Sequence, residues 1–295
     1  MKPTIALIGP GRVGSAITKK LFEAGYRLTA VVSRNYQRAI TACQFIGCSN
    51  KLATEELSTA AAADIVMIAV PDDHIHDVAQ QLRQNNKLQK TSVLIHFSGL
   101  HPAAIMGGGP TTTNLLSLHP LLPFATREKG YEALNRCPCA IESPDSQNIS
   151  LGKELISALD ATPFIINADK KILYHAAACI SSNYLVTLMA VARDMLVHCG
   201  IEREQAIPLL LPLIQTALNN VEELGPEQGL TGPISRGDSG TVAKHLQAIE
   251  EKVPELLSLY RELGIHTTQL AERSARLNKQ QTDSLCELLS VNKSA

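Results

Sequence analysis

The first half of the chain alternates short apolar runs with amphipathic stretches. Four runs have the length and the β-branched, apolar composition of strands buried on both faces: residues 4–8, 28–32, 65–70 and 92–97. Runs at 117–118, 139–142 and 162–166 predict further strands, and the Gly, Pro and Thr cluster at 107–113 predicts an exposed loop. Strands that alternate with helices in this way predict a mainly parallel α/β sheet.

From about residue 169 the apolar spacing becomes helical and the strands cease. Residues 170–199 predict one continuous helix that ends at Gly200, because glycine commonly follows the last turn of a helix. Further helices are expected at residues 203–224, 240–263 and 266–289, with a loop at 225–237. The predicted fold is a doubly wound α/β Rossmann domain over residues 1–167, followed by an all-α domain over residues 168–295.

Composition narrows the class of partner. Hydrophobic residues make up 45% and charged residues 19% of the chain, as in soluble globular proteins. The net charge of -1 gives no basic field that would attract nucleic acid or an anionic membrane. No apolar run is expected to span a membrane, since the best candidate, residues 206–214, carries two prolines. Small molecules are therefore the expected partners, without nucleic acid or membrane.

The N-terminus and the cysteines bear on the compartment. The apolar run of MKPTIALIGP is too short, and too soon broken by glycine and proline, for a signal peptide. The seven cysteines form an odd set without a CxxC pair, which is typical of scattered reduced thiols rather than of a disulfide framework or a zinc site. We therefore expect a cytoplasmic protein.

A glycine-rich turn follows the first predicted strand and precedes a helix. Its residues fit the pattern G-x-G-x-x-G: Gly9, Pro10, Gly11, Arg12, Val13 and Gly14. The first glycine permits the tight turn, the second lets the backbone approach a pyrophosphate, and the third lets the helix pack closely on the strand. The pattern predicts dinucleotide binding at the helix N-terminus. A glycine turn without a ligand and an S-adenosylmethionine site are the alternatives.

The end of the second strand indicates which dinucleotide is bound. An NAD site usually has Asp or Glu here, whereas this chain has Ser33 and Arg34. A hydroxyl and a guanidinium suit a 2′-phosphate, which a carboxylate would repel, so NADP(H) is predicted. The alternative is that Arg34 is a solvated surface residue. The ends of the third and fourth strands complete the predicted cofactor site: Ala69, Val70, Pro71, Ser98 and Gly99.

Residues of metal-ligand type follow Pro71. They are Asp72, Asp73, His74, His76 and Asp77. On a helix, neighbours one or two positions apart do not face each other, so their spacing does not suit a metal ion. The pattern favours acidic residues near a helix N-terminus, and no metal site is predicted.

Candidate catalytic residues lie at strand ends and on the long helix. His96 and His119 each end an apolar run, where an imidazole either borders the nicotinamide or is structural. Lys171, His175, Ala178 and Ser182 share one face of the helix, with Asn183 beside them. We predict that His175 donates or accepts the proton and that Lys171 stabilises a developing oxyanion. Ser182, Asn183 and His119 are predicted to orient the substrate.

Two alternatives concern these helical segments. The polar face of the long helix also suits packing against backbone groups between domains. In the loop at 231–238, Asp238 is a credible N-cap of the next helix, and Arg236 is a candidate ligand for a substrate carboxylate.

Three segments resemble a bacterial family of NADP oxidoreductases, of no assigned function, that joins a Rossmann-like domain to a helical C-terminal domain. They are residues 119–121 with Phe124, 174–178 with 182–184, and 230–234 with 236–238. More distantly, the architecture is similar to pyrroline-5-carboxylate reductase, ketopantoate reductase, and the 6-phosphogluconate and 3-hydroxyisobutyrate dehydrogenases. The resemblance implies hydride transfer between the domains and a homodimer joined through the helical domain.

One departure from the hydroxyacid dehydrogenases limits what the resemblance implies. Their interdomain helix carries a lysine and, four residues on, an asparagine, whereas here Lys171 is followed by His175. The substrate class therefore does not carry over. The sequence predicts an NADP(H)-dependent oxidoreductase that transfers hydride to or from a small C=O or C=N substrate at the interdomain cleft. A non-catalytic NADP(H)-binding sensor or scaffold is the alternative.

Overall fold

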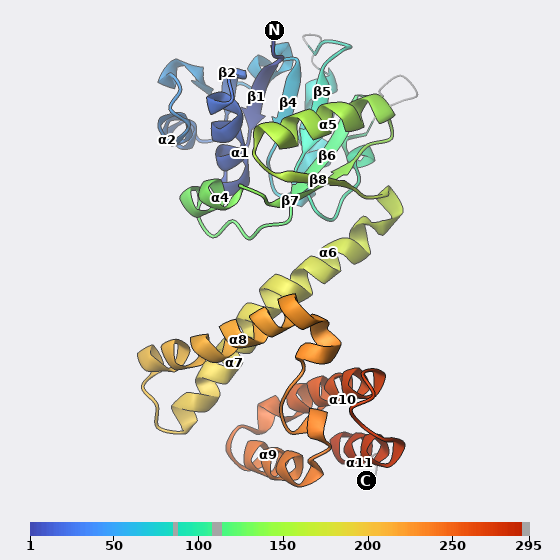
Figure 1. Ribbon diagram of the computed structural model, residues 1–295. Coiled ribbons are helices and arrows are strands. Elements are labelled where there is room, and N and C mark those ends of the chain that lie inside the picture. Colours follow the sequence, from blue (N-terminus) through green and yellow to red (C-terminus); the bar gives the residue numbers. More distant parts are fainter. Residues whose placement is uncertain (85–87, 108–113, 291–295) are drawn as a thin grey trace. The chain divides into compact units, whose positions relative to one another are not determined.

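The fold is that of a computed structural model, which describes residues 1–84, 88–107 and 114–290 (Figure 1). Apart from Gly107, the loop predicted at 107–113 lies outside the described residues. The chain divides into two compact units, Met1–Tyr184 and Leu185–Ala295, which are described separately below. The first unit thus extends beyond residue 167, where the sequence placed the boundary, and includes the start of the long helix.

The first unit is built on an eight-stranded sheet with the order β3-β2-β1-β4-β5-β6-β7-β8. Its strands are β1 Thr4–Ile8, β2 Arg27–Val32, β3 Ala53–Thr54, β4 Ile65–Ile68, β5 Val93–His96, β6 Leu115–Pro120, β7 Pro138–Glu142 and β8 Thr162–Ile165. Neighbouring strands are parallel, except that β6 and β7 are antiparallel. The strand order reverses between β1 and β4, and ligands of open α/β sheets bind beside such a reversal at the carboxyl ends of the strands. The predicted Rossmann architecture is confirmed.

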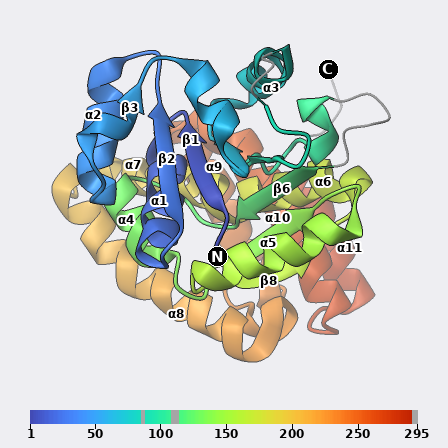
Figure 2. The same cartoon turned by 90° about the horizontal axis from the view of Figure 1, so that it is seen from above.

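Apolar residues of the strands pack on both faces of the sheet. In β1, Ile5 and Leu7 belong to the core under one face, and Ala6 and Ile8 to the core under the other, because successive side chains point to opposite faces. Helices α1 Arg12–Glu23, α2 Tyr36–Ile46 and α5 Ser146–Ala158 contribute to the first core, and α3 Ile75–Gln84 contributes to the second. Figure 2 shows α3 and α5 on opposite sides of the sheet.

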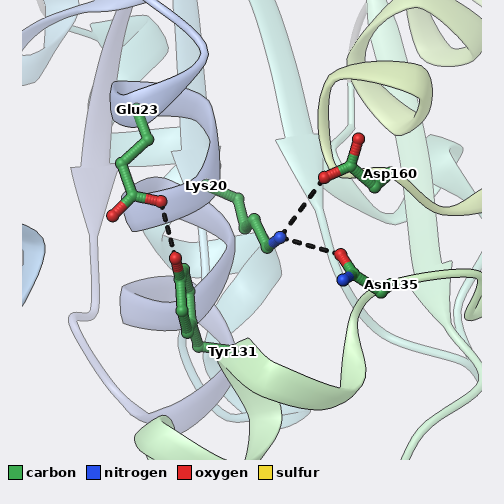
Figure 3. A network of polar contacts seen from close by, with 5 residues as sticks. All are labelled: Lys20, Glu23, Tyr131, Asn135 and Asp160. Carbon is green, nitrogen blue, oxygen red and sulfur yellow. Dashed lines mark hydrogen bonds and ion pairs between the residues drawn. The ribbon is translucent and has the colours of Figure 1, made fainter.

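Polar contacts join α1 to α4 Arg127–Ala133, to the residues just after α4 and to the turn between α5 and β8 (Figure 3). The Lys20 ammonium donates to Asn135 Oδ1 at 2.9 Å and lies 3.4 Å from Asp160 Oδ2. The Tyr131 hydroxyl donates to Glu23 Oε2 at 2.8 Å. These contacts are exposed, so each contributes little to stability and mainly sets the orientation of α1. That orientation matters because the glycine turn lies at the other end of α1.

The predicted long helix is present and spans Ala168–His198. It comprises a 3-10 turn at Ala168–Lys170, α6 Lys171–Cys179, a π-helical segment Ile180–Tyr184 and α7 Leu185–His198. Gly200 follows with φ +86°, the left-handed conformation expected of a glycine that ends a helix. By length and composition alone this helix is able to cross a membrane, so the expectation that no segment meets that criterion was wrong.

The second unit is all-α, as predicted, but its helix boundaries differ from the prediction. Its remaining helices are α8 Arg203–Gly229, α9 Ser239–Lys252, α10 Leu257–Arg273 and α11 Lys279–Leu289. The breaks fall at Val253–Pro254 and between Arg273 and Lys279, rather than at residues 264–265. Gly264 lies inside α10. A Cβ on it would meet Leu289 Cδ2 at 2.6 Å, so the glycine permits α10 and α11 to pack closely.

Candidate functional site

The glycine turn lies where β1 ends and α1 begins. Gly9 has φ +80°, and a Cβ on it would lie 2.7 Å from the Ala69 carbonyl oxygen. A Cβ on Gly14 would lie 2.7 Å from Ala69 Cβ, so this glycine lets α1 pack on the end of β4. A Cβ on Gly11 would meet only the Gly9 carbonyl, at 4.0 Å, so the space beside Gly11 is open. Each glycine thus has the role that the dinucleotide pattern assigns to it.

A cavity of about 640 Å3 lies beside this turn, at the carboxyl ends of β1, β2, β3 and β4. Eight of the predicted cofactor residues line it: Gly9, Pro10, Gly11, Ser33, Arg34, Ala69, Val70 and Pro71. The first peptide N–H groups of α1, from Arg12 to Gly14, lack helical partners and are free to bind an anion at the same end. The site therefore has the shape and the donors that a dinucleotide requires.

Four charged residues line the cavity: Arg34, Arg38, Glu55 and Asp77. Arg34 and Arg38 both line it, and both are exposed without an ion pair in the described part of the chain. Arg38 lies in the first turn of α2, where its backbone N–H donates to the N-cap Asn35 at 3.1 Å. Glu55, just after β3, also lines the cavity and accepts from the Tyr36 backbone N–H at 3.2 Å. Two guanidinium groups and two carboxylates, those of Glu55 and of Asp77 in α3, thus line the cavity.

Arg38 and Glu55 were not among the predicted site residues. Arg38 lies four residues after Arg34, so both were readable as one basic cluster at the start of α2. Glu55 had no such signal, because β3 has only two residues and was not predicted as a strand. Five predicted cofactor residues are not among those that line the cavity: Arg12, Val13, Gly14, Ser98 and Gly99.

Lys171, at the start of α6, is fully buried. Its ammonium donates to the Ser117 hydroxyl at 2.8 Å and to the Ser98 carbonyl at 3.1 Å, and so ties the helix to the ends of β5 and β6. Burial lowers the pKa of Lys171 to about 8, while the nearby Glu142 and Asp72 carboxylates oppose that shift. These bonds join α6 to β5 and β6, and the oxyanion-stabilising role predicted for Lys171 stays a prediction.

Histidines from β6 and α6 converge beside Gly99. A Cβ on Gly99 would lie 2.6 Å from His175 Nδ1 and 2.8 Å from His119 Nε2. The two rings meet edge to face, with centroids 5.9 Å apart. His119 Nδ1 lies 2.7 Å from the Tyr174 hydroxyl. The structure therefore brings His119 and His175 together, as predicted, and adds Tyr174.

The rest of the predicted helical face is less regular. Cys179 Sγ lies 3.8 Å from His175 Nε2, one helical turn on. Ser182 and Asn183 belong to the π-helical segment, whose i to i+5 bonds replace the α-helical spacing that put Ser182 in line with Lys171. Ser182 is half-buried and Asn183 is exposed.

The remaining candidates are structural in these surroundings or lie in the second unit. His96 is fully buried: its Nδ1 accepts from the Ser98 backbone N–H at 3.1 Å, and its Nε2 lies 3.2 Å from the Pro102 carbonyl. The Ser98 hydroxyl donates to Asp72 at 2.7 Å. Asp238 caps α9, as predicted, by accepting from the Thr241 backbone N–H at 2.9 Å, and Arg236 is exposed.

Fold and site together define a dinucleotide-binding protein of the Rossmann class. In keeping with this, residues 4–98 match the family model described as NADP oxidoreductase, coenzyme F420-dependent. Residues 137–267 match the family model described as a domain of unknown function, DUF2520. Two successive parts of the chain thus match an NADP-oxidoreductase model and a DUF2520 model, in keeping with the resemblance.

Two solved structures are similar to this chain in fold, and one known protein is similar to part of it in sequence. The fold is similar to a putative NADP oxidoreductase from Bacteroides fragilis, with 21% identity, a TM-score of 0.73, and coverage of 92% of this chain and 99% of that one. It is also similar to Plasmodium falciparum pyrroline carboxylate reductase with NADP bound, with 15% identity, a TM-score of 0.60, and coverage of 98% and 99%. Glutamyl-tRNA reductase from Methanopyrus kandleri is 28% identical over 88 residues, which are 28% of this chain and 22% of that protein. The chain therefore shares its fold with both of these solved structures.

Proposed function

We propose that this protein is an NADP(H)-dependent oxidoreductase that transfers hydride to or from a C=O or C=N bond of a small substrate. The observation that carries the proposal is that a dinucleotide-type glycine turn and a cluster of histidines lie at the same edge of one sheet. The glycine turn follows β1, and His119 lies at the end of β6. A ligand that extends along the carboxyl ends of the strands would reach from one to the other.

The charges around the cavity support NADP(H) over NAD(H). A 2′-phosphate adds a dianionic group that guanidinium groups bind through charge-assisted hydrogen bonds. Arg34 and Arg38 both line the cavity and have no other ion-pair partner in the described residues. The Glu55 carboxylate, by contrast, would suit the free ribose 2′-hydroxyl of NAD(H). NADP is also named for the Plasmodium falciparum structure that has this fold.

In this proposal the chain's own residues bind and orient the reactants. The glycine turn and the first turn of α1 would hold the pyrophosphate, and Arg34 with Arg38 would hold the 2′-phosphate. When bound, the cofactor supplies or accepts the hydride. His175 is the candidate that handles the substrate's proton directly or through solvent, and His119 is the candidate that orients the substrate, with Ser182 and Asn183 further along the helix. Lys171 positions α6 against the sheet.

We also propose that the partner is a second copy of this chain, and that it works in the cytoplasm. Helix α7 has no buried residue, and α8 has only Ala206 and Gly229 buried, although both helices are rich in leucine and valine. An apolar surface of this kind marks an interaction site, which a symmetric copy would cover. All seven cysteines lie in the described part of the chain and are free, which supports a reducing compartment.

Binding is tested first, by titration calorimetry with NADPH and NADH on the folded protein. We expect NADPH to bind at least tenfold more tightly, since one charge-assisted hydrogen bond is worth about 1.5 to 3 kcal/mol. The double variant Arg34→Ala/Arg38→Ala should lose this preference by weakening NADPH and leaving NADH unchanged. Glu55→Gln is the matched control, because it removes the opposing charge and should keep or strengthen NADPH binding.

Hydride transfer is tested separately. NADPH oxidation should be detectable with at least one compound from a panel of aldehydes, ketones and imines, and coenzyme F420 belongs in the panel because the matching family is described by it. Binding of NADPH without oxidation by any compound would support the sensor or scaffold instead. If neither nucleotide binds to folded protein, the proposal is wrong.

A further inference from the structure

His119 and Tyr174 form a hydrogen-bonded pair that is held on several sides. Their rings meet edge to face with centroids 5.5 Å apart, and His119 Nδ1 lies 2.7 Å from the Tyr174 hydroxyl. On its other side the Tyr174 ring packs on Phe164 of β8, with centroids 5.9 Å apart. Contacts from β6, β8 and α6 therefore fix both the position and the orientation of the imidazole.

The chemistry of the two groups indicates the direction of the hydrogen bond. Burial, together with the charges of Lys171 and His175, lowers the pKa of His119 to about 4, so the imidazole is neutral at pH 7. Burial raises the pKa of Tyr174, so the phenol keeps its proton. A neutral imidazole has one donor and one acceptor nitrogen. If the phenol donates to Nδ1, the imidazole hydrogen is on Nε2 and both the O–H and the N–H group can donate. If Nδ1–H donates to the phenol oxygen instead, the phenol hydrogen has no acceptor.

The other nitrogen of His119 faces the site. Nε2 lies 2.8 Å from the point that a Cβ of Gly99 would occupy, at the carboxyl end of β5. It has no hydrogen-bond partner in the described part of the chain, and it is not sealed from solvent. His175 differs in this respect, because its Nδ1 is both unpartnered and buried. His119 Nε2 is therefore an accessible nitrogen without a partner, whereas the second nitrogen of His175, Nε2, lies 3.8 Å from Cys179 Sγ.

We infer that the Tyr174 hydroxyl donates to His119 Nδ1, and that His119 Nε2–H is the hydrogen-bond donor that binds the oxygen of a carbonyl substrate. This inference rests on the proposed function and narrows its substrate class to neutral aldehydes and ketones. A carbonyl oxygen accepts from an N–H group, whereas a protonated iminium presents its own N–H donor and would be repelled. Tyr174 is a positioning residue, since it acts through His119.

This arrangement suits the charge that develops during carbonyl reduction. Bound NADPH would supply the hydride that forms the new C–H bond. As the π bond of the carbonyl breaks, its electron pair moves to oxygen, where the His119 N–H group stabilises the negative charge. A neutral imidazole can do this without giving up its proton, and the alkoxide then takes a proton from solvent. The imidazole thus acts as a fixed donor, and Lys171 does not need to contact the oxygen.

The tautomer can be measured without cofactor or turnover. Long-range 1H–15N correlation spectra of the 15N-histidine-labelled, ligand-free protein at pH 7.5 should show His119 as the Nε2–H tautomer, assigned with His119→Gln. Tyr174→Phe should shift His119 toward a mixture of tautomers. A wild-type His119 in the Nδ1–H or imidazolium form would overturn the inference, whether or not Tyr174→Phe folds.

A second His–Tyr pair provides the matched control. His245 Nδ1 lies 2.8 Å from the Tyr260 hydroxyl in the second unit, with ring centroids 6.0 Å apart. Tyr260→Phe removes the same group from a pair of the same geometry and should leave the His119 signals unchanged. A change in the His119 signals as large as that caused by Tyr174→Phe would count against a local hydrogen bond.

Kinetics test the substrate class. His119→Phe, whose ring has no N–H group, should lower kcat for an aldehyde or ketone by roughly 100-fold, as loss of an oxyanion donor does, and leave NADPH affinity in calorimetry unchanged. The iminium salt of a primary amine, which carries an N–H group, should be reduced at least tenfold more slowly than the matching ketone. Faster reduction of the iminium salt would overturn the carbonyl assignment. Absence of NADPH binding by the wild type would instead reject the proposed function, while the tautomer measurement would stand.

Discussion

Lys171 illustrates how a residue of catalytic type acquires a structural role. The sequence predicted it as an oxyanion stabiliser because of its place on the helix, but the side chain is fully buried and bonded to Ser117 and Ser98. A buried ammonium is tolerated only where it is hydrogen-bonded and its charge is balanced, and the carboxylates of Glu142 and Asp72 lie near enough to influence it. The observed contacts of Lys171 therefore hold α6, which carries His175, against β6, which carries His119, while its predicted catalytic role stays a prediction.

The buried histidine of β5 makes stability depend on pH. Burial lowers the pKa of His96 to about 3, whereas an unfolded histidine titrates near pH 6.5. Below pH 6.5 the unfolded state takes up a proton that the folded state does not, so the free energy of unfolding falls as the pH falls. For His96 this loss should reach about 2 kcal/mol between pH 6.5 and pH 5, measured by urea denaturation.

His96→Gln should reduce that loss, whatever its effect on stability at pH 7. His198→Gln, which removes an exposed imidazole, is the matched control. If the two variants lose the same free energy over this pH interval, His96 is not the titrating group.

At the scale of elements, features that depend on neighbouring residues in the sequence were predictable. Contacts between residues far apart in the sequence were not. The β-branched runs gave seven of the strands, and the glycine turn, Arg34 and the Asp238 cap were readable because each depends on neighbouring residues. The strand at Ala53–Thr54 was missed because two residues carry no period. Tyr174 and Glu55 have their roles only once distant strands and helices meet, and no local spacing indicates that.

The helix breaks of the second unit show the same limit. The sequence placed a helix break at residues 264–265, yet Gly264 lies inside α10. Its missing side chain leaves room there for Leu289 of α11. The break is instead at Val253–Pro254. The helical spacing of apolar residues continues across this point, so the spacing did not reveal the break. A glycine in a helical pattern can therefore either end the helix or permit close packing of a second helix. Only the position of the second helix distinguishes the two cases.

Two glycine substitutions test this reading. Gly264→Ala should destabilise the protein by about 1 to 3 kcal/mol, because its Cβ would overlap the buried Leu289 side chain. Gly240→Ala, in the first turn of α9, meets only Asp238 Oδ1 at 3.7 Å and should stabilise by up to about 1 kcal/mol through helix propensity. Chemical denaturation measures both, and equal effects of the two changes would contradict the packing role of Gly264.

At the scale of the whole molecule, the apolar surface of α7 and α8 needs an explanation. The hydrophobic core of the second unit is formed by residues from Ile234 to Leu289, so α7 and α8 do not supply it. Leu209, Leu213 and Val186 are among their exposed side chains. Single exposed leucines are ordinary, but two contacting helices that together expose many leucine and valine side chains are typical of an interface between subunits.

A second copy on this surface predicts a dimer in solution at micromolar concentration, measured by size-exclusion chromatography with light scattering. Leu213→Glu places a charge on this surface and should give a monomer, because an unpaired charge is costly to bury. Gln215→Glu adds the same charge at a polar position of the same helix and should leave the dimer intact. A monomeric wild type would contradict the proposal.

The two arginines beside the cavity bear on the direction of the reaction in a living cell. Cells keep their phosphorylated nicotinamide pool mostly reduced and the unphosphorylated pool mostly oxidised. A protein that selects its carrier by the 2′-phosphate therefore draws on the supply of electrons for biosynthesis. With Arg34 and Arg38 in that role, flux would run toward the reduced product and would follow the cell's reducing power.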